Sequence, residues 1–334
     1  MPNNIELLHK HPGDIAEFIE TQEDNEQFLT FLLLPNAIKS DVFSYLVGST
    51  QKDIVKKLGA SQTAELLENM APDDRTELFE NFPDSLIKES VNLLSDSEKN
   101  IALSLLGYPK ECVARLMSPY YVQARKEWTI KRTFDHIKKF GKKAETLNFI
   151  YIVDEQNHLI DDIRIGKMLM ADEEQTLESV MDYQFEYLTV LMSKEDSIEH
   201  FDKYDRAALP VVTENMVLVG IVTFDDIIDE IEKINTEDFQ KLAAVEALDL
   251  SYTETSLLVL VKKRATWLII LFFGEMLTAT AMGYYEMEIA KAVILAMFVP
   301  LIISAGGNSG SQAATLIVRA MAVKEIHLKD WFYV

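Results

Sequence analysis

Hydrophobic and polar positions follow three successive patterns along the chain. Over residues 1–115, apolar side chains recur at helical spacing, as in AELLENM and RTELFENF, and prolines stand where one short helix would end and the next begin. Residues 33–46 loosely echo residues 69–82. Such a repeat indicates stacked helical hairpins, so we expect an all-α superhelical N-domain.

Between residues 116 and 235 the pattern changes to short apolar strands alternating with helices. Residues 149–165 and 209–223 each give a strand, an acidic or amide-rich turn and a second strand, and a helical stretch precedes each pair. The offset of about 60 residues indicates an internal duplication. Two such α/β units can bury their sheets against each other.

Residues 264–334 are predominantly apolar. The run 265–285 is long enough to cross a membrane once, and a second crossing runs from about residue 289 through PLIISAGGNSGSQAATLIVRAMA. Basic residues 262–264 precede the first crossing, and others stand at or beyond the far end of the second. The positive-inside tendency then predicts a multi-pass protein in the cell membrane, surrounded by lipid, with its N-terminal domains in the cytoplasm.

The second crossing carries a hydrophilic stripe. On a helix, Asn308, Gln312 and Thr315 share one face, whereas Gly306 lies on the opposite face. Polar side chains within a membrane face a bundle interior or a water-filled path, and small residues let another helix approach closely. Glu275, near the middle of the first crossing, either meets a passing cation or hydrogen-bonds a neighbouring helix. The expected pore-lining residues are Glu275, Gly306, Asn308, Gln312 and Thr315.

Charge divides the chain differently. The whole sequence holds 32 Lys and Arg against 54 Asp and Glu, a net charge of −22, but residues 251–334 hold seven basic and six acidic residues. Residues 1–250 therefore carry nearly all of the negative charge, which excludes nucleic acid as a partner and favours cations. An ordinary solvated surface accounts for most of these carboxylates, and a subset forming cation sites stays open.

Three further features narrow the function. The N-terminus has no basic stretch followed by an apolar core, so we expect no cleavable signal peptide. The single cysteine, Cys112, has no internal disulfide partner and is expected to be a buried structural thiol. The six histidines are scattered without catalytic spacing or a nucleophile motif, so we do not expect an enzyme.

The segment GIVTFDD (220–226) resembles the signature of paired CBS modules, which are ligand-sensing domains. The resemblance implies an adenine-nucleotide pocket, such as one for ATP, at Gly220, Thr223 and Asp226. Helix capping by Thr223, with Asp226 in the first turn, would explain the same residues without a nucleotide. The first copy departs from the signature, with Asp161, Arg164 and Lys167 at the matching positions.

The segment GGNSGSQAATL (306–316) closely resembles the second-membrane-helix signature of MgtE-type magnesium channels. The order of parts also matches that family: acidic N-domain, CBS pair, connecting "plug" helix, membrane helices. The resemblance implies a Mg2+-selective homodimer that closes when intracellular Mg2+ bridges its acidic surfaces. The implied regulatory Mg2+ residues are Glu214, Asp225, Asp226, Asp229, Glu246, Asp249 and Glu254. Family members can place further acid beside Glu214, where this chain has Thr213 and Asn215.

The family has five membrane helices per subunit and its main selectivity carboxylate on the last one, whereas two crossings are predicted here. The chain is then either a fragment of a longer protein or a shortened regulatory form, and we expect a fragment. Its expected parts are the N-domain (1–115), the CBS pair (116–235), the linker and plug helix (236–263) and two membrane helices (264–334). The first hypothesis is the gate of a channel moving Mg2+ across the cytoplasmic membrane and closing when intracellular Mg2+ is high. The second is a membrane-tethered CBS adenine-nucleotide sensor without transport activity.

Overall fold

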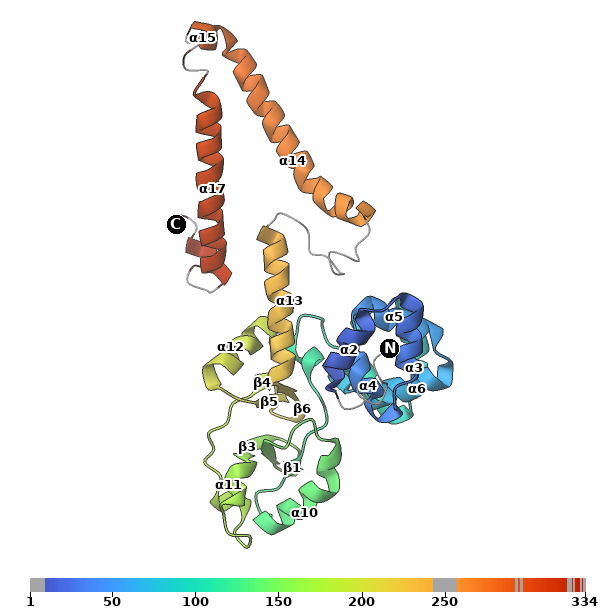
Figure 1. Ribbon diagram of the computed structural model, residues 1–334. Helices are drawn as coiled ribbons and strands as arrows, with labels where there is room; N and C mark the ends of the chain where they lie inside the picture. Colours follow the sequence, from blue (N-terminus) through green and yellow to red (C-terminus); the bar gives the residue numbers. More distant parts are fainter. Residues whose placement is uncertain are drawn as a thin grey trace. The chain divides into compact units, whose positions relative to one another are not determined.

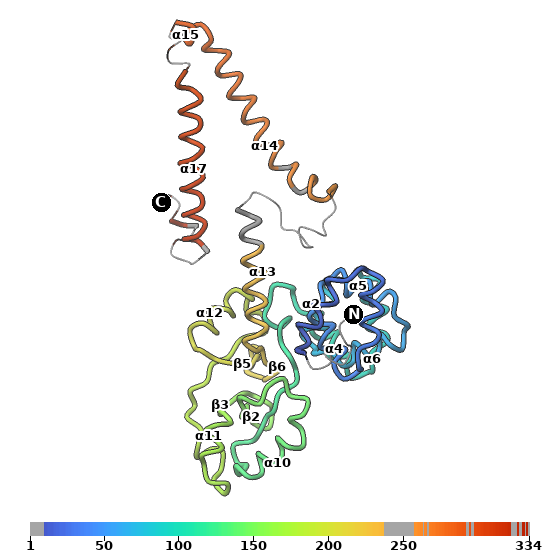
Figure 2. The backbone as a smooth tube through the Cα atoms, in the orientation of Figure 1, coloured from blue at the N-terminus to red at the C-terminus, as the bar shows by residue number. Residues whose placement is uncertain are grey.

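The computed structural model describes residues 10–242, 257–291, 294, 297–322, 326, 328–330 and 332 (Figure 2). It divides into two compact parts, Met1–Ile231 and Glu232–Val334, each of which is treated by itself below. The predicted regulatory residues Glu246, Asp249 and Glu254 lie outside the described residues, as does much of the expected linker.

Short helices follow one another through the N-domain (Figure 1). They are α2 (Pro12–Glu20), α3 (Asp24–Leu32), α4 (Asn36–Ser44), α5 (Gly48–Lys57), α6 (Ala60–Asn69), α7 (Pro72–Glu80), α8 (Asp84–Leu93) and α9 (Asp96–Leu106). Helix α2 packs on α4, α4 on α6 and α6 on α8, so alternate helices stack. The fully buried rings of Phe31, Phe43 and Phe79 lie in the core between them. The predicted all-α superhelical domain is confirmed.

The next segment contains two copies of one α/β unit. The first comprises β1 (Gln123–Ala124), α10 (Ile130–Phe140), β2 (Phe149–Val153), β3 (Leu159–Arg164) and α11 (Ile165–Leu169). The second comprises β4 (Leu188–Thr189), α12 (Lys194–Tyr204), β5 (Ala208–Val212), β6 (Leu218–Thr223) and α13 (Phe224–Leu242). Each sheet has its first strand parallel and its third antiparallel to the central one. The predicted duplication is confirmed.

The two copies share details that periodicity does not reveal. Each hairpin has a register irregularity at the end of its central strand, and each hairpin turn holds one left-handed residue, Asn157 or Met216. The copies also exchange equivalent bonds: the Leu159 amide donates to the Met216 carbonyl at 2.8 Å, and the Leu218 amide to the Asn157 carbonyl at 3.0 Å. One apolar cluster contains side chains of both sheets. The pair therefore has approximate twofold symmetry.

The chain enters the first copy through a linker that is fixed to the second. The short helix η1 (Val113–Leu116) precedes Ser118, whose amide donates to the Ile221 carbonyl at 2.8 Å and whose carbonyl accepts from the Ile221 amide at 2.9 Å. A Cβ atom added to Gly220 would lie 2.9 Å from the Met117 sulfur and 3.0 Å from the Ser118 carbonyl oxygen. Glycine at position 220 is what lets the linker lie against β6.

The C-terminal part contains α14 (Leu257–Tyr284), α15 (Glu286–Lys291), α17 (Val299–Ala322) and the short η4 (Leu328–Asp330) (Figure 1). Pro300 stands in the first turn of α17, where its missing N–H removes no helical hydrogen bond. Within the described residues, no helix combines the length and the apolar character that a membrane crossing requires. The two crossings over this part stay a prediction.

Candidate functional site

Carboxylates from the N-domain and from both α/β copies meet at one place, which we call the acidic junction and define as Asp73, Asp74, Glu145 and Asp226. Asp73 and Asp74 occupy the first turn of α7, after Pro72, where acidic side chains favour the helix dipole. Asp226 occupies the first turn of α13. Glu145 lies between α10 and β2 of the first copy.

Helix capping fixes the Asp226 carboxylate. The Thr223 amide donates to Asp226 Oδ2 at 3.0 Å, and the Thr223 hydroxyl donates to the same oxygen at 2.6 Å. The Asp73 and Asp226 carboxyls also lie within hydrogen-bonding reach of each other. Oδ1 of Asp73 is buried and has no hydrogen-bond partner within the described residues. The junction thus contains an unsatisfied acceptor inside a domain interface.

Every carboxyl of the acidic junction titrates above its ordinary range. Burial, with the Asp226 charge second, raises the pKa of Asp73 well above its usual value. Burial raises the pKa of Asp226, although the hydrogen bonds from Thr223 lower it in part. Burial also raises the pKa of Asp74 to about 6. The Glu145 side chain is exposed as a whole, yet lost hydration of its carboxyl raises its pKa against a hydrogen bond from Ser118.

Two carboxyls within hydrogen-bonding reach of each other favour a proton or a cation between them, because ionising both side by side is costly. The acidic junction therefore favours uptake of positive charge when the N-domain and the second copy are together. Within the part of the chain described, no group of three or more His, Cys, Asp or Glu side chains has the arrangement of a metal site. The arrangement is a buried acid pair with further acids around it.

The remaining predicted regulatory residues lie apart from this pair. Asp225 is exposed beside it, and its charge contributes to the raised pKa of Glu145. Asp229 lies one turn further along α13 and is exposed. Glu214 stands in the β5–β6 turn, at the opposite end of β6 from Thr223, so the structure does not bring it to the junction. These assignments stay predictions.

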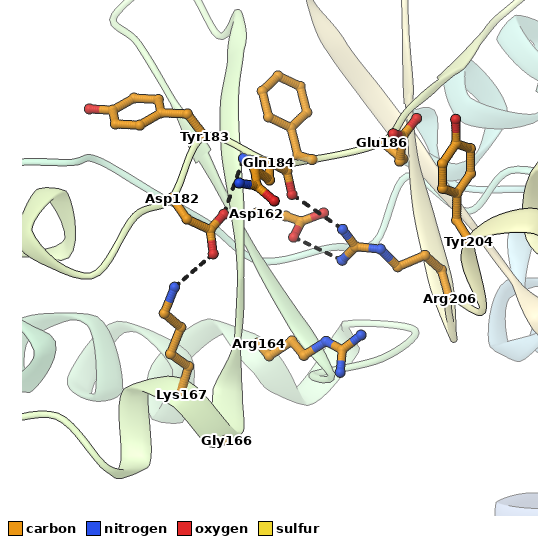
Figure 3. Close-up of a pocket in the computed structure, with 11 residues that line it drawn as sticks. Asp162, Arg164, Gly166, Lys167, Asp182, Tyr183, Gln184, Glu186, Tyr204 and Arg206 are labelled. Atoms are coloured by element: carbon orange, nitrogen blue, oxygen red, sulfur yellow. Dashed lines mark hydrogen bonds and ion pairs between the residues drawn. The ribbon is translucent and has the colours of Figure 1, made fainter.

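The predicted nucleotide residues take part in other contacts. Thr223 and Asp226 make the capping interaction described above, which is the alternative left open for them. Gly220 faces the linker. A cavity of about 890 Å³ lies instead at the matching end of the first copy (Figure 3). Its size is that of a small-molecule site.

Basic and aromatic side chains line this cavity. The Arg164 and Arg206 guanidiniums lie 5.6 Å and 5.1 Å from the centroid of the same ring, Phe149. Lys167 pairs with Asp182 at 2.8 Å, and Arg206 pairs with Asp162 at 3.1 Å (Figure 3). The lining residues are Asp162, Arg164, Gly166, Lys167, Asp182, Tyr183, Gln184, Phe185, Glu186, Tyr204 and Arg206.

Buried polar groups shape the cavity wall. Asp161 is fully buried, and its carboxylate accepts from the amides of Asp182 and Tyr183 at 3.1 Å each, which holds the loop that closes one side. The Asp162 oxygen Oδ2 and the hydroxyl of Tyr151, its cross-strand neighbour, are buried without partners in the described residues. Unsatisfied groups beside a cavity indicate a site that a polar ligand would complete.

The predicted pore-lining residues lie on two helices of the C-terminal part. Glu275 is on α14, and Gly306, Asn308, Gln312 and Thr315 are on α17. All five are exposed in this chain, and the Thr315 hydroxyl donates to the Ser311 carbonyl at 2.9 Å. A pore-lining role for them stays a prediction.

Several residues of these sites escaped the sequence analysis. Asp73 and Asp74 follow a proline at the start of a helix, which explains them locally and does not show that they face another domain. Arg164 and Lys167 depart from the CBS signature at the matching positions, so the signature does not predict a site there. Arg206 carries no recognisable local signal, since its role arises from pairing with Asp162 in a distant segment.

Comparison with known proteins agrees with this organisation. Residues 10–111 match the model of the MgtE intracellular N domain, residues 177–233 that of the CBS domain, and residues 299–334 that of the divalent cation transporter family. The chain is similar to the cytosolic domain of the Mg2+ channel MgtE in complex with ATP, with 26% identity and a TM-score of 0.65. That likeness covers 68% of this chain and 93% of the other.

Two curated relatives carry the name magnesium transporter MgtE. That of Bacillus subtilis is 30% identical over 70% of this chain and 51% of its own length. That of Thermus thermophilus is 33% identical over 96% of this chain. This chain spans about half of the first protein and 72% of the second. On this similarity, together with the family models, the chain belongs to the MgtE family of magnesium transporters.

Proposed function

We propose that this chain forms the cytosolic gate and the first membrane helices of a homodimeric Mg2+ transporter of the cell membrane. In this proposal residues 1–115, 116–235 and 236–263 sense intracellular Mg2+, and residues 264–334 line the path with Asn308 and Gln312. Family membership supports the transported ion. The acidic junction supports the sensing role.

The observation that carries the proposal is the approach of the buried Asp73 carboxyl to the half-buried Asp226 carboxyl across the interface between the N-domain and the second CBS copy. At neutral pH and low Mg2+, ionised carboxylates repel each other there and favour separation of the two domains. Asp73 and Asp226 would hold a regulatory Mg2+ through carboxylate oxygens, with Asp74 and Glu145 adding charge and water completing its shell. The unpartnered Asp73 Oδ1 fits such a ligand.

Regulation then follows from linkage. The state with the N-domain docked brings the two carboxylates together and so binds the cation more tightly than the separated state does. High Mg2+ therefore favours the docked state, and the same difference in affinity sets how far the equilibrium can move. Asp225, Asp229 and Glu214 would contribute to the attracting field from the CBS surface.

Limited proteolysis of the chain in detergent tests the sensing role. Raising Mg2+ through the millimolar range should protect residues 107–122, because this linker runs along the interface. D73N should flatten the response, since it removes both the repulsion and one cation ligand. D135N, which alters an exposed acid on α10, is the matched control and should respond as the parent chain does. Equal responses in D73N and the parent would remove Asp73 from the sensor.

We propose a second function, binding of an adenine nucleotide such as ATP, in the cavity of the first CBS copy. Support comes from the two guanidiniums stacked on Phe149, the unsatisfied Tyr151 hydroxyl and the similarity to an ATP-bound MgtE cytosolic domain. Arg164 and Lys167 would meet phosphates, and the tyrosines that line the cavity would pack on the base. Nucleotide binding without Mg2+ transport would correspond to the sensor hypothesis.

Calorimetric titration with ATP measures this second function directly. R164A should weaken ATP binding roughly tenfold, the order of magnitude of one lost charge-assisted hydrogen bond. R132A is the matched control, because the Arg132 guanidinium also stacks on an aromatic ring, 4.3 Å from the Trp128 centroid, but lies outside the cavity. If both variants bind ATP as the parent does, the cavity is not the nucleotide site.

A further inference from the structure

A second connection joins the N-domain to the CBS pair, and it contains no cation site. Arg75 is completely buried in α7, and its guanidinium donates to the Leu67 carbonyl at 2.9 Å and to Glu98 Oε2 at 2.8 Å. The other oxygen of Glu98 accepts a short hydrogen bond from the Tyr120 hydroxyl. Arg75 and Glu98 belong to the N-domain, whereas Tyr120 belongs to the linker, so the network crosses the domain boundary.

The linker end of this network is anchored on both CBS copies. The Tyr120 carbonyl accepts from the Glu145 amide of the first copy at 2.8 Å. Ser118, two residues earlier, is paired with Ile221 of the second copy through both of its backbone groups. The segment 118–120 therefore contacts the N-domain and both CBS copies, and one of its partners, Glu145, belongs to the acidic junction.

The network is also attached to the junction from the N-domain side. Arg75 follows Asp73 and Asp74 directly on α7, and its guanidinium holds that helix to α6 and α9. Burial would raise the pKa of Glu98, but the bonds from Tyr120 and Arg75 lower it overall, so Glu98 stays a charged acceptor. Burial and Glu98 raise the pKa of Tyr120 to about 12, so its hydroxyl keeps the proton that it donates.

We infer that Arg75, Glu98 and Tyr120 form a tether that positions Asp73 against Asp226, and that they are positioning residues for the regulatory junction. The inference rests on the proposed sensing function. The tether opposes displacement of the N-domain when the carboxylates repel each other, without preventing the separated state. The interface then reforms in register when positive charge arrives, and the entropy lost on docking is reduced.

Y120F tests the tether because it removes one hydroxyl and leaves the ring in place. Limited proteolysis of the full chain with Mg2+ should show a midpoint about threefold to tenfold higher than that of the parent, the range for one net hydrogen bond. In EDTA, cleavage within residues 107–122 should also be faster. Y121F is the matched control: it removes a neighbouring hydroxyl that donates to the Leu218 carbonyl within the CBS pair, and its Mg2+ midpoint should not move.

If Tyr120 had a merely structural role, Y120F would lower the resistance to urea and leave the Mg2+ midpoint unchanged. Both urea unfolding and the Mg2+ midpoint are therefore measured. E98Q keeps an acceptor for Tyr120 and should stay closer to the parent midpoint than E98A does. The tether is overturned if Y120F and the parent share both the midpoint and the cleavage rate in EDTA. If the parent shows no Mg2+ response, the sensing function fails, and the EDTA cleavage rates alone then decide whether the tether exists.

Discussion

Asp226 has two partners of opposite kinds. Thr223 donates two hydrogen bonds to one of its oxygens and so caps α13, while the Asp73 carboxyl approaches from the N-domain. The capping bonds fix the orientation of the Asp226 carboxylate before the N-domain docks, so docking does not have to restrict the Asp226 side chain. A residue that looks like an ordinary helix cap is therefore also suited to respond to charge.

The raised pKa of Asp74, about 6 against an ordinary 3.8, predicts a stability that falls as pH rises. A carboxyl whose folded pKa is raised stabilises the fold fully below its unfolded pKa, and this contribution is lost as pH rises through the folded value. Between pH 4 and 7 without divalent ions, the free energy of unfolding of the parent should fall relative to that of D74N by at most about 3 kcal/mol. Urea unfolding at several pH values measures it.

D135N provides the reference for the pH series, because Asp135 is exposed on α10. The free energy of unfolding of D135N, relative to that of D74N, should fall with rising pH as much as that of the parent does. A parent-to-D74N difference that stays flat from pH 4 to 7 would mean that Asp74 remains hydrated in the folded protein.

At the scale of elements, the linker and β6 control how the domains meet. Ser118 can pair with Ile221 because position 220 has no side chain. The tether residue Tyr120 lies two residues after Ser118, so this pairing also places its side chain. The resemblance assigned Gly220 to a nucleotide pocket, whereas in the structure it contacts the linker. Small shifts of this segment would change both the tether and the acidic junction.

G220A should destabilise the cytosolic domains by roughly 1 to 3 kcal/mol, since the added methyl group would overlap a backbone carbonyl that cannot move freely. Chemical unfolding gives the value. The control is G166A: nothing lies within 4 Å of a Cβ at this position of α11, so alanine should be neutral or stabilise by about 0.5 to 1 kcal/mol. Equal stability of G220A and the parent would show that the linker does not need the close approach.

Elements were predictable from the sequence where local periodicity determines them. Helical spacing with proline punctuation predicted the N-domain stack, and the duplicated strand pairs predicted the CBS copies. The contacts between Asp73 and Asp226 and between Arg75 and Glu98 could not be predicted, because they depend on how separate elements pack. The signature matches the second copy and predicts a nucleotide pocket there. The cavity instead lies at the first copy, where Arg164 departs from the signature.

At the scale of the whole molecule, the acidic charge gathers in the domains that precede the predicted membrane helices. Those domains carry about 23 excess negative charges, whereas residues 251–334 are nearly neutral. A field of this sign concentrates cations near the cytosolic domains, and under the proposed sensing function their compactness would depend on divalent ions. Under the proposed function, Mg2+ therefore changes the distance between the N-domain and the second CBS copy.

Double electron–electron resonance tests this claim most directly. Spin labels at D53C and D202C, both exposed sites, would report the separation between the N-domain and the second copy. C112S removes the native buried thiol and keeps a donor for the Pro109 carbonyl. We predict a broad distance distribution in EDTA that becomes narrow in millimolar Mg2+, and a much smaller change when D73N is added. The same distribution with and without Mg2+ would contradict the account.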